Sequence, residues 1–249
     1  MVNRTDYIAS LAKGLAVIEV FRAESPRLSI TDVAAATGLD RATARRCLLT
    51  LHQLGYADYD GKFFQLTPRV LRLGMGALAA LPLPQIVQPW LDQLSERTGI
   101  SSSVSLLDDT HIVYIARAAK RRVMSIGLMP GSRLPAHCTS MGRVLLAALP
   151  EAEARAIVER SDLSPRTPYS ITDPEEILAR IAQVRRQGYC VIDQEVELGL
   201  RSIAVPVRNT HDKVVAALNL GSPLGSEDLA DAYLPELQKV QAGLKRVLK

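Results

Sequence analysis

Residues 29–54 read SITDVAAATGLDRATARRCLLTLHQL, a pattern typical of two helices joined by a tight turn. Ser29 and Asp32 have the spacing of a capping box at the start of the first helix, and Asp40 is placed to cap the second. Gly38 stands between them, where a helix that ends in a left-handed residue favours glycine. Small or apolar residues on either side of the turn complete the spacing of a helix-turn-helix, Ala34 and Ala44.

The second of these helices has one apolar and one basic face. The apolar stripe consists of Ala44, Cys47, Leu48, Leu51 and Leu54. In a helix-turn-helix the N-terminal end of this helix enters the major groove, where arginine pairs with guanine or phosphate and threonine reaches a phosphate or a thymine methyl. The alternative is an ordinary solvated helix surface. The predicted DNA contacts on this face are Arg41, Ala42, Thr43, Arg45 and Arg46.

The flanking segments extend the unit to a winged helix-turn-helix. Two short strands are predicted at 56–59 and 62–66, with Asp60-Gly61 between them supplying two positive-φ residues for a two-residue hairpin. Lys62 at the wing tip is a further predicted DNA contact, with a merely solubilising charge as the equal alternative. A support helix is predicted upstream from apolar residues at helical spacing, Leu11, Leu15, Ile18 and Phe21.

The overall composition is compatible with this interpretation. The chain has 249 residues, of which 47% are hydrophobic and 22% charged, as expected for a soluble protein of two domains. Residues 1–66 contain eight Lys and Arg against seven Asp and Glu, so the positive charge is concentrated on one helix. Three cysteines and four histidines without ligand or pairing spacing predict no disulfide framework, no metal site and no cofactor. The absence of a signal peptide or membrane-length apolar run predicts a cytoplasmic protein with no membrane partner.

The chain divides into three predicted parts: a DNA-binding domain at 1–66, a helical linker at 67–83 and a second domain at 84–249. Thr67-Pro68 starts the linker helix, and Leu81-Pro-Leu-Pro ends it. An exposed apolar helix is a liability in a monomer, so we expect it to pack against the second domain or another subunit. Its apolar face consists of Val70, Leu71, Leu73 and Leu78.

Beyond residue 84 the pattern predicts an α+β domain with a mainly antiparallel sheet. Strands are expected at 101–107, 111–117, 122–126, 189–193, 202–208 and 214–220, mostly joined by hairpins. Helices are expected at 84–97, 139–149, 151–159, 174–187 and from 226 onward, grouped on one side of the sheet. Such a sheet leaves a pocket against its covering helices and loops.

Three segments in order carry a family resemblance: ARRCLLTL at 44–51, LPAHCTSMGRVLLA at 134–147 and DQEVELGLRSIAV at 193–205. Over essentially its whole length the chain resembles the IclR family of bacterial transcriptional regulators, most closely the subgroup that controls aromatic-acid catabolism through protocatechuate and β-ketoadipate. The resemblance implies a regulator that binds an operator in double-stranded DNA as a homodimer or homotetramer. It also implies that the C-terminal domain is GAF-like and binds a small carboxylate effector.

The resemblance further implies which residues contact the effector. Ser140 lies at the start of a predicted helix, whose unpaired N–H groups suit a carboxylate. The apolar members of the set favour an aromatic or larger ligand, such as protocatechuate, 4-hydroxybenzoate or β-ketoadipate. The effector residues implied by the family are Ile126, Ser140, Met141, Leu200, Ser202, Asn219 and Gly221.

Arginines near these segments are candidate carboxylate anchors, because a guanidinium can hold both oxygens at once. The candidates are Arg117, Arg121, Arg122, Arg133 and Arg143. Among them Arg133 is favoured as facing the ligand, together with His137.

The sequence also allows functions other than transcriptional regulation. Cys138 beside His137 suggests a thiol-dependent enzyme, since a helix N-terminus can depress a thiol pKa. Adjacent side chains rarely face each other, however, so a packed cysteine and a protein without enzymatic activity are predicted. A regulator of another carboxylate pathway is the nearer alternative. In either regulator, effector binding is expected to act on DNA through the linker helix, residues 68–80.

Overall fold

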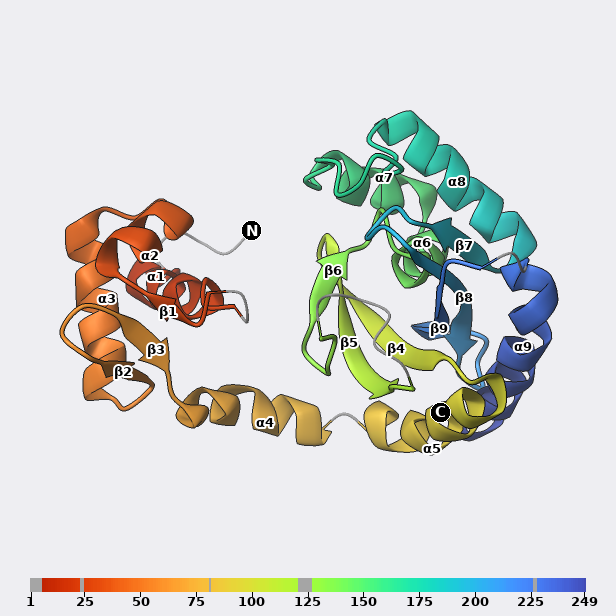
Figure 1. Cartoon of the computed structure of the whole chain (residues 1–249), viewed down its shortest axis with the longest axis horizontal. Coiled ribbons are helices and arrows are strands. Elements are labelled where there is room, and N and C mark those ends of the chain that lie inside the picture. Colours follow the sequence, from red (N-terminus) through yellow and green to blue (C-terminus); the bar gives the residue numbers. More distant parts are fainter. Residues whose placement is uncertain (1–5, 23–24, 81, 121–126, 226–227) are drawn as a thin grey trace. The chain divides into compact units, whose positions relative to one another are not determined.

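The computed structural model describes residues 6–22, 25–80, 82–120, 127–225 and 228–249 (Figure 1). Contacts divide the chain into two compact units, Met1–Leu81 and Pro82–Lys249. The division falls inside the segment predicted as the linker. Within the described ranges, no helix combines the length and the apolar composition that crossing a bilayer requires.

The first unit is a winged helix-turn-helix, as predicted. Its helices are α1 (Ala9–Glu19), α2 (Ile30–Thr37) and α3 (Arg41–Gln53), and its antiparallel sheet has the order β1 (Arg27–Leu28), β3 (Phe64–Leu66), β2 (Ala57–Tyr59). Both halves of the Ser29–Asp32 capping box form, and Gly38 has φ 69°. The Asp40 carboxylate accepts from the Thr43 N–H at 2.8 Å and so begins α3. The local signals therefore place both helices and the turn correctly.

The inward face of the support helix α1 differs from the prediction. Leu11 and Leu15 are 60% and 48% exposed, whereas Val17 is fully buried in the core of this unit. At about 100° per residue, position 17 lies roughly 200° around the helix from position 15. Ile18 and Phe21 do pack against the core from the helix's C-terminal end. The predicted stripe is therefore wrong for its first two members.

The wing turn is longer than the predicted two-residue hairpin. Tyr59 pairs with Phe64, so the four residues 60–63 form the loop. Of the predicted pair Asp60-Gly61, Gly61 alone has positive φ, at 100°. The Asp60 Oδ1 accepts the N–H groups of Lys62 and Phe63 at 2.9 and 2.8 Å. This side chain substitutes for backbone acceptors in the turn, which removes the need for a second left-handed residue.

After the wing, the chain continues as a short 3-10 turn, η1 (Pro68–Val70), and the helix α4 (Leu71–Ala80). The Thr67 hydroxyl caps the turn by accepting from the Arg69 N–H at 3.3 Å. Leu71 and Leu73 are 68% and 54% exposed. The linker segment therefore presents apolar side chains to solvent in the isolated chain.

The second unit contains a six-stranded sheet in which every pairing is antiparallel. The order is β6 (Arg133–Pro135), β5 (His111–Ala118), β4 (Ser101–Asp108), β9 (Val214–Pro223), β8 (Leu200–Arg208), β7 (Cys190–Asp193). The predicted α+β class with an antiparallel sheet is confirmed. The short strand β6 was not predicted, and the strand expected at 122–126 lies outside the described residues.

Helices cover both faces of this sheet, so the expectation of one covered side is wrong (Figure 1). One face packs on α5 (Leu83–Thr98) and α9 (Leu229–Val247), and the other on α6 (Ser140–Ala147), α7 (Glu151–Glu159) and α8 (Pro174–Gln187). The reason is visible in β8, where Ile203 and Val205 join one core and the alternating Ala204 joins the other. A strand buried on both faces needs two covering layers.

Candidate DNA-binding and effector sites

The N-terminal half of α3 presents a basic surface. Arg41, Arg45 and Arg46 are exposed, and no acidic side chain in the described part of the chain forms an ion pair with them. Ala42 is exposed beside them, and Thr43 is half-buried. The positive charges are therefore available to phosphates or guanines.

Two predicted DNA contacts have partners within the unit. The Thr43 hydroxyl donates to the Asp40 carboxylate at 2.7 Å, so it belongs to the cap of α3 and offers only its lone pairs and methyl group outward. Lys62 is exposed at the wing, with Nζ 5.0 Å from the centre of the Phe63 ring. Both positions remain predictions as DNA contacts.

In the second unit a cavity that is partly open to solvent lies between the sheet and the start of α6. It brings together six of the effector residues that the resemblance implied: Ser140, Met141, Leu200, Ser202, Asn219 and Gly221. The seventh, Ile126, lies outside the described residues. Arg117, one of the candidate carboxylate anchors, also lines the cavity. The rest of the lining was not predicted from the sequence: Ser101, Tyr114, Leu128, Leu134, Thr139 and Val196.

The cavity floor is a polar region of the sheet. In one register row Ser101, Gly221 and Ser202 are neighbours on β4, β9 and β8, and in the next row Arg117, Ser103 and Asn219 are neighbours on β5, β4 and β9. Both rows lie on the face covered by α6, since these residues alternate with buried apolar ones that face α5 and α9. Ser202 donates to the Ser140 hydroxyl of α6 at 2.9 Å and ties this floor to the helix.

A β-bulge explains how Tyr114 and Arg117 both reach this cavity. The register steps from Ser105–Tyr114 directly to Val104–Ala116, which makes Ile115 the extra residue. Residues three apart on a regular strand point to opposite faces, whereas the added residue returns Arg117 to the face of Tyr114. Burial raises the pKa of the Tyr114 hydroxyl to about 12, so it stays protonated.

Among the described residues, Arg117 is the arginine that lines the cavity, whereas the candidates Arg121 and Arg122 lie outside the described residues. The Arg117 Nη1 donates to the Ser103 hydroxyl at 3.0 Å, and within the described residues no carboxylate lies at ion-pair distance. Burial lowers the pKa of its guanidinium, because desolvation disfavours the charged form. A half-buried cation without an anion is the group in this cavity that most needs a negatively charged ligand.

The two residues favoured from sequence do not line the cavity. Arg133 is about half exposed and pairs with Asp108 at 2.7 Å. His137 is buried, and its backbone carbonyl accepts from the Arg143 Nε at 2.7 Å. Burial lowers the pKa of the His137 imidazole to about 4, and the Arg143 guanidinium adds to the lowering. Their predicted contact with the ligand therefore has no support from the geometry.

The N-terminus of α6 faces the cavity. Thr139 caps the helix by accepting from the Gly142 N–H at 3.1 Å, and the Arg143 N–H bonds to the Thr139 carbonyl at 3.0 Å. The first four N–H groups of a helix have no acceptor within it. Those of Ser140 and Met141 thus remain at the end of the helix that lines the cavity.

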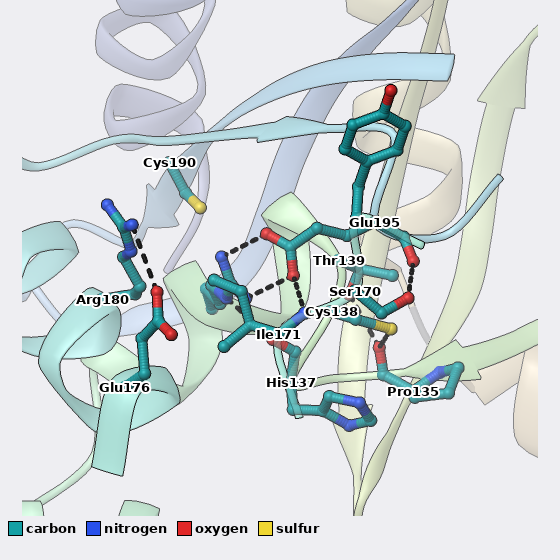
Figure 2. A network of polar contacts seen from close by, with 12 residues as sticks. Pro135, His137, Cys138, Thr139, Ser170, Ile171, Glu176, Arg180, Cys190 and Glu195 are labelled. Carbon is teal, nitrogen blue, oxygen red and sulfur yellow. Dashed lines mark hydrogen bonds and ion pairs between the residues drawn. The ribbon is translucent and has the colours of Figure 1, made fainter. Parts of the chain in front are cut away.

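The side chain of Glu195 belongs to a buried network of polar contacts (Figure 2). Arg143, on α6, donates from both Nη atoms to the two Glu195 oxygens at 2.8 and 2.6 Å, and the two side chains are 3% and 8% exposed. Burial raises the pKa of the Glu195 carboxyl, and the Arg143 guanidinium opposes part of the rise. The backbone carbonyl of Glu195 accepts from the Ser170 hydroxyl at 2.7 Å. The adjacent Val196 lines the cavity, so this pair fixes the loop to α6.

Cys138 lacks the exposure and the lowered pKa that a reactive thiol needs. It is fully buried, and burial raises the pKa of the thiol to about 12. The thiol-enzyme alternative needs a lowered pKa at the helix N-terminus, but desolvation dominates and raises it. Among the described residues, no group of three His, Cys, Asp or Glu side chains is arranged to hold a metal ion.

Known protein families match both units of the chain. The family described as "IclR helix-turn-helix domain" matches residues 10–61, and "Bacterial transcriptional regulator IclR C-terminal" matches residues 75–240. The chain is 45% identical over 236 residues to the Pca regulon regulatory protein of Pseudomonas putida, covering 93% of this chain and 81% of the relative. It is 40% identical over 255 residues to the p-hydroxybenzoate hydroxylase transcriptional activator of Acinetobacter baylyi, covering 99% and 94%.

A solved structure of an inducer-binding domain is also similar to this chain. The inducer-binding domain of a PobR transcription factor double mutant from Acinetobacter, in complex with 3-hydroxybenzoic acid, is 35% identical with a TM-score of 0.62. The match covers 66% of this chain and 98% of that domain. The family resemblance and its aromatic-catabolism subgroup are thus confirmed. The chain belongs to the IclR family of bacterial transcriptional regulators.

Proposed function

We propose that this protein regulates genes of aromatic-acid catabolism in response to a small aromatic carboxylate bound in the cavity of its second unit. The observation that carries the proposal is Arg117, a half-buried cation that lines the cavity and has no carboxylate partner among the described residues. The names of two relatives, a Pca regulon regulator and a p-hydroxybenzoate hydroxylase activator, support the pathway. The hydroxybenzoic acid complex of the Acinetobacter domain supports the ligand class.

The cavity has the parts that an aromatic carboxylate needs. Arg117 supplies a charge for the carboxylate, and the N–H groups of Ser140 and Met141 supply hydrogen bonds at the positive end of a helix. Apolar side chains surround the space for a ring, namely Leu128, Leu134, Met141, Val196 and Leu200. This combination of a few polar groups with apolar walls is typical of small-molecule sites.

We propose that the protein binds its operator through α3 as a homodimer or homotetramer in the bacterial cytoplasm. One winged helix reads few base pairs, and a two-fold partner doubles the site. The exposed apolar residues Leu71 and Leu73 on α4 support burial against a second subunit. Effector binding then changes the placement of the paired α3 helices through the segment 67–83.

No enzymatic activity is proposed for the chain. Thiol chemistry needs a thiolate with a base within hydrogen-bond reach. Cys138 is buried with a raised pKa, and its Sγ contacts the Pro135 carbonyl at 3.9 Å. These features support a packing role for this cysteine.

Arg45→Ala should weaken operator binding by about 1–3 kcal/mol, since an arginine fork on a base or phosphate contributes about that much. Fluorescence anisotropy on an operator duplex selected from a random library measures the loss. Arg186→Ala is the matched control, because it removes the same charge from an exposed position on α8. Equal affinities for the two variants would remove Arg45 from the DNA-reading face.

A thermal-unfolding panel tests the effector class. The ligands are protocatechuate, 4-hydroxybenzoate, β-ketoadipate, catechol, muconate and glyoxylate. A ligand at about one hundred times its Kd stabilises the folded state by roughly 2.7 kcal/mol, or about 5–10 °C in Tm for a unit of this size. We expect the shift with an aromatic carboxylate, and none with catechol, which lacks the carboxylate. A shift with glyoxylate alone would assign the protein to another carboxylate pathway.

Two arginine variants locate the anchor in the same assay. Arg117→Met should abolish the ligand-induced shift, because it removes the cation from the cavity. Arg133→Met removes an equal charge that pairs with Asp108 away from the cavity lining, and should keep the shift. The reverse result would return the anchor to Arg133 and contradict the proposed ligand pose.

A further inference from the structure

One buried polar atom in the cavity lacks a hydrogen-bond partner among the described residues. Asn219, on β9, is 8% exposed and lines the cavity. Its Oδ1 is buried and accepts no hydrogen bond from any residue that the structure describes. Buried acceptors in folded proteins almost always have a donor, because an unpaired one keeps the cost of its lost hydration. The donor for Asn219 is therefore to be sought in whatever fills the cavity.

The neighbours of Asn219 in the sheet do not supply that donor. Its register partners are Ser103 on β4 and Ala204 on β8. The Ser103 hydroxyl accepts from the Arg117 Nη1 at 3.0 Å and forms no hydrogen bond with the Asn219 Oδ1, and alanine has no polar side-chain atom. Two residues farther along β9, Gly221 also lines the cavity and has no side chain that could donate to the amide. The sequence thus places an amide where the strand neighbours leave it free for a ligand.

Arg117 and Asn219 occupy separate places on the cavity floor. They lie on β5 and β9, the two strands that flank β4, so about two strand spacings, roughly 10 Å, separate their backbones. A ligand that satisfies both groups carries an anion at one end and a hydrogen-bond donor at another. An aromatic ring with a carboxylate and a hydroxyl group has this arrangement.

We propose that Asn219 recognises a hydroxyl group of the effector, so that the cavity selects hydroxylated aromatic carboxylates over their unhydroxylated analogues. This inference rests on the proposed function, since it assigns the second polar group of the same ligand. A site that pairs a buried polar group with a ligand hydroxyl rejects the analogue lacking it, because the protein group is then left unpaired. Discrimination thus arises from the protein acceptor as much as from the ligand.

The test compares ligands that differ by one hydroxyl group. Isothermal titration of the full-length protein with benzoate, 3-hydroxybenzoate and 4-hydroxybenzoate gives a Kd for each. We expect the tighter hydroxybenzoate to bind at least about tenfold more tightly than benzoate. Asn219→Leu keeps the branching at Cγ and removes the polar atoms of the amide. It should bring the ratio of the two Kd values close to one while benzoate still binds.

Gly221→Ala is the matched control. It lies on the same strand and lines the same cavity, and its added Cβ meets only Leu200 Cδ1, at 4.0 Å. It should change both Kd values together and preserve their ratio. Equal binding of benzoate and hydroxybenzoates by the unaltered protein, or an unchanged ratio in Asn219→Leu, would overturn the inference and leave the aromatic-carboxylate effector in place. Absence of binding by these three acids and by protocatechuate would instead remove the proposed function, and the inference with it.

Discussion

Glu195→Ala should lower the free energy of unfolding of the effector-binding unit by about 3–5 kcal/mol, because it leaves the Arg143 guanidinium buried without its counter-charge. The pair is bidentate, and Arg143 also donates to the His137 carbonyl, so the arginine has no path to solvent without displacing the start of α6. Urea denaturation followed by tryptophan fluorescence measures the change, since Trp90 packs against the other core of this unit.

Two variants separate the buried pair from an ordinary salt bridge. Asp108→Ala breaks the exposed pair with Arg133 and should cost less than about 1 kcal/mol. The double variant Arg143→Met/Glu195→Met removes both charges and should recover most of the stability lost in Glu195→Ala. If Glu195→Ala costs no more than Asp108→Ala, the pair does not hold the loop to α6.

Gly142→Ala should destabilise the same unit by about 3 kcal/mol and abolish effector binding. Alanine normally favours a helix over glycine by about 1 kcal/mol, so the expected sign opposes helix propensity. The reason is steric: a Cβ at this position would overlap the backbone carbonyl of Ala136 and the Thr139 hydroxyl that caps α6. Relief requires the helix N-terminus to move, which displaces Ser140 and Met141 in the cavity wall.

A glycine in another helix provides the control. A Cβ at Gly14, in α1, meets nothing within 4 Å. Gly14→Ala should therefore stabilise the first unit by up to about 1 kcal/mol, as expected for an unhindered helical position. Calorimetric unfolding of both variants gives the comparison. A stabilising Gly142→Ala would show that the loop before α6 yields easily, contrary to its tight packing.

The helix-turn-helix was predictable because its signals are local. Ser29, Asp32, Gly38 and Asp40 act within three or four residues of chain, and each adopts the predicted role. Burial is less local, which explains the error at α1: the periodic Leu11 and Leu15 are exposed, and Val17 packs inside. A stripe of apolar residues predicts that a segment is helical, but it does not determine which side of the helix faces the core.

The cavity was predictable only in part for a comparable reason. The resemblance supplied six residues of its lining, from Ser140 to Gly221. Arg117 reaches the cavity because of a bulge at Ile115. The bulge results from the pairing of two strands and cannot be predicted from the sequence of either strand alone, so the sequence did not favour Arg117 over Arg133. Glu195 stood in a quoted segment, yet its partner Arg143 is 52 positions away in the chain.

The hydrophobic cores of the two units have no residue in common. A substitution within one core therefore changes no core residue of the other unit, and in the proposed regulator operator choice and inducer choice belong to different units. Recombination within the segment 67–83 exchanges one trait and preserves the other. A bacterium that acquires a new catabolic operon thus needs only a new DNA-binding unit joined to an existing effector-binding unit. A designed biosensor can be assembled by the same exchange.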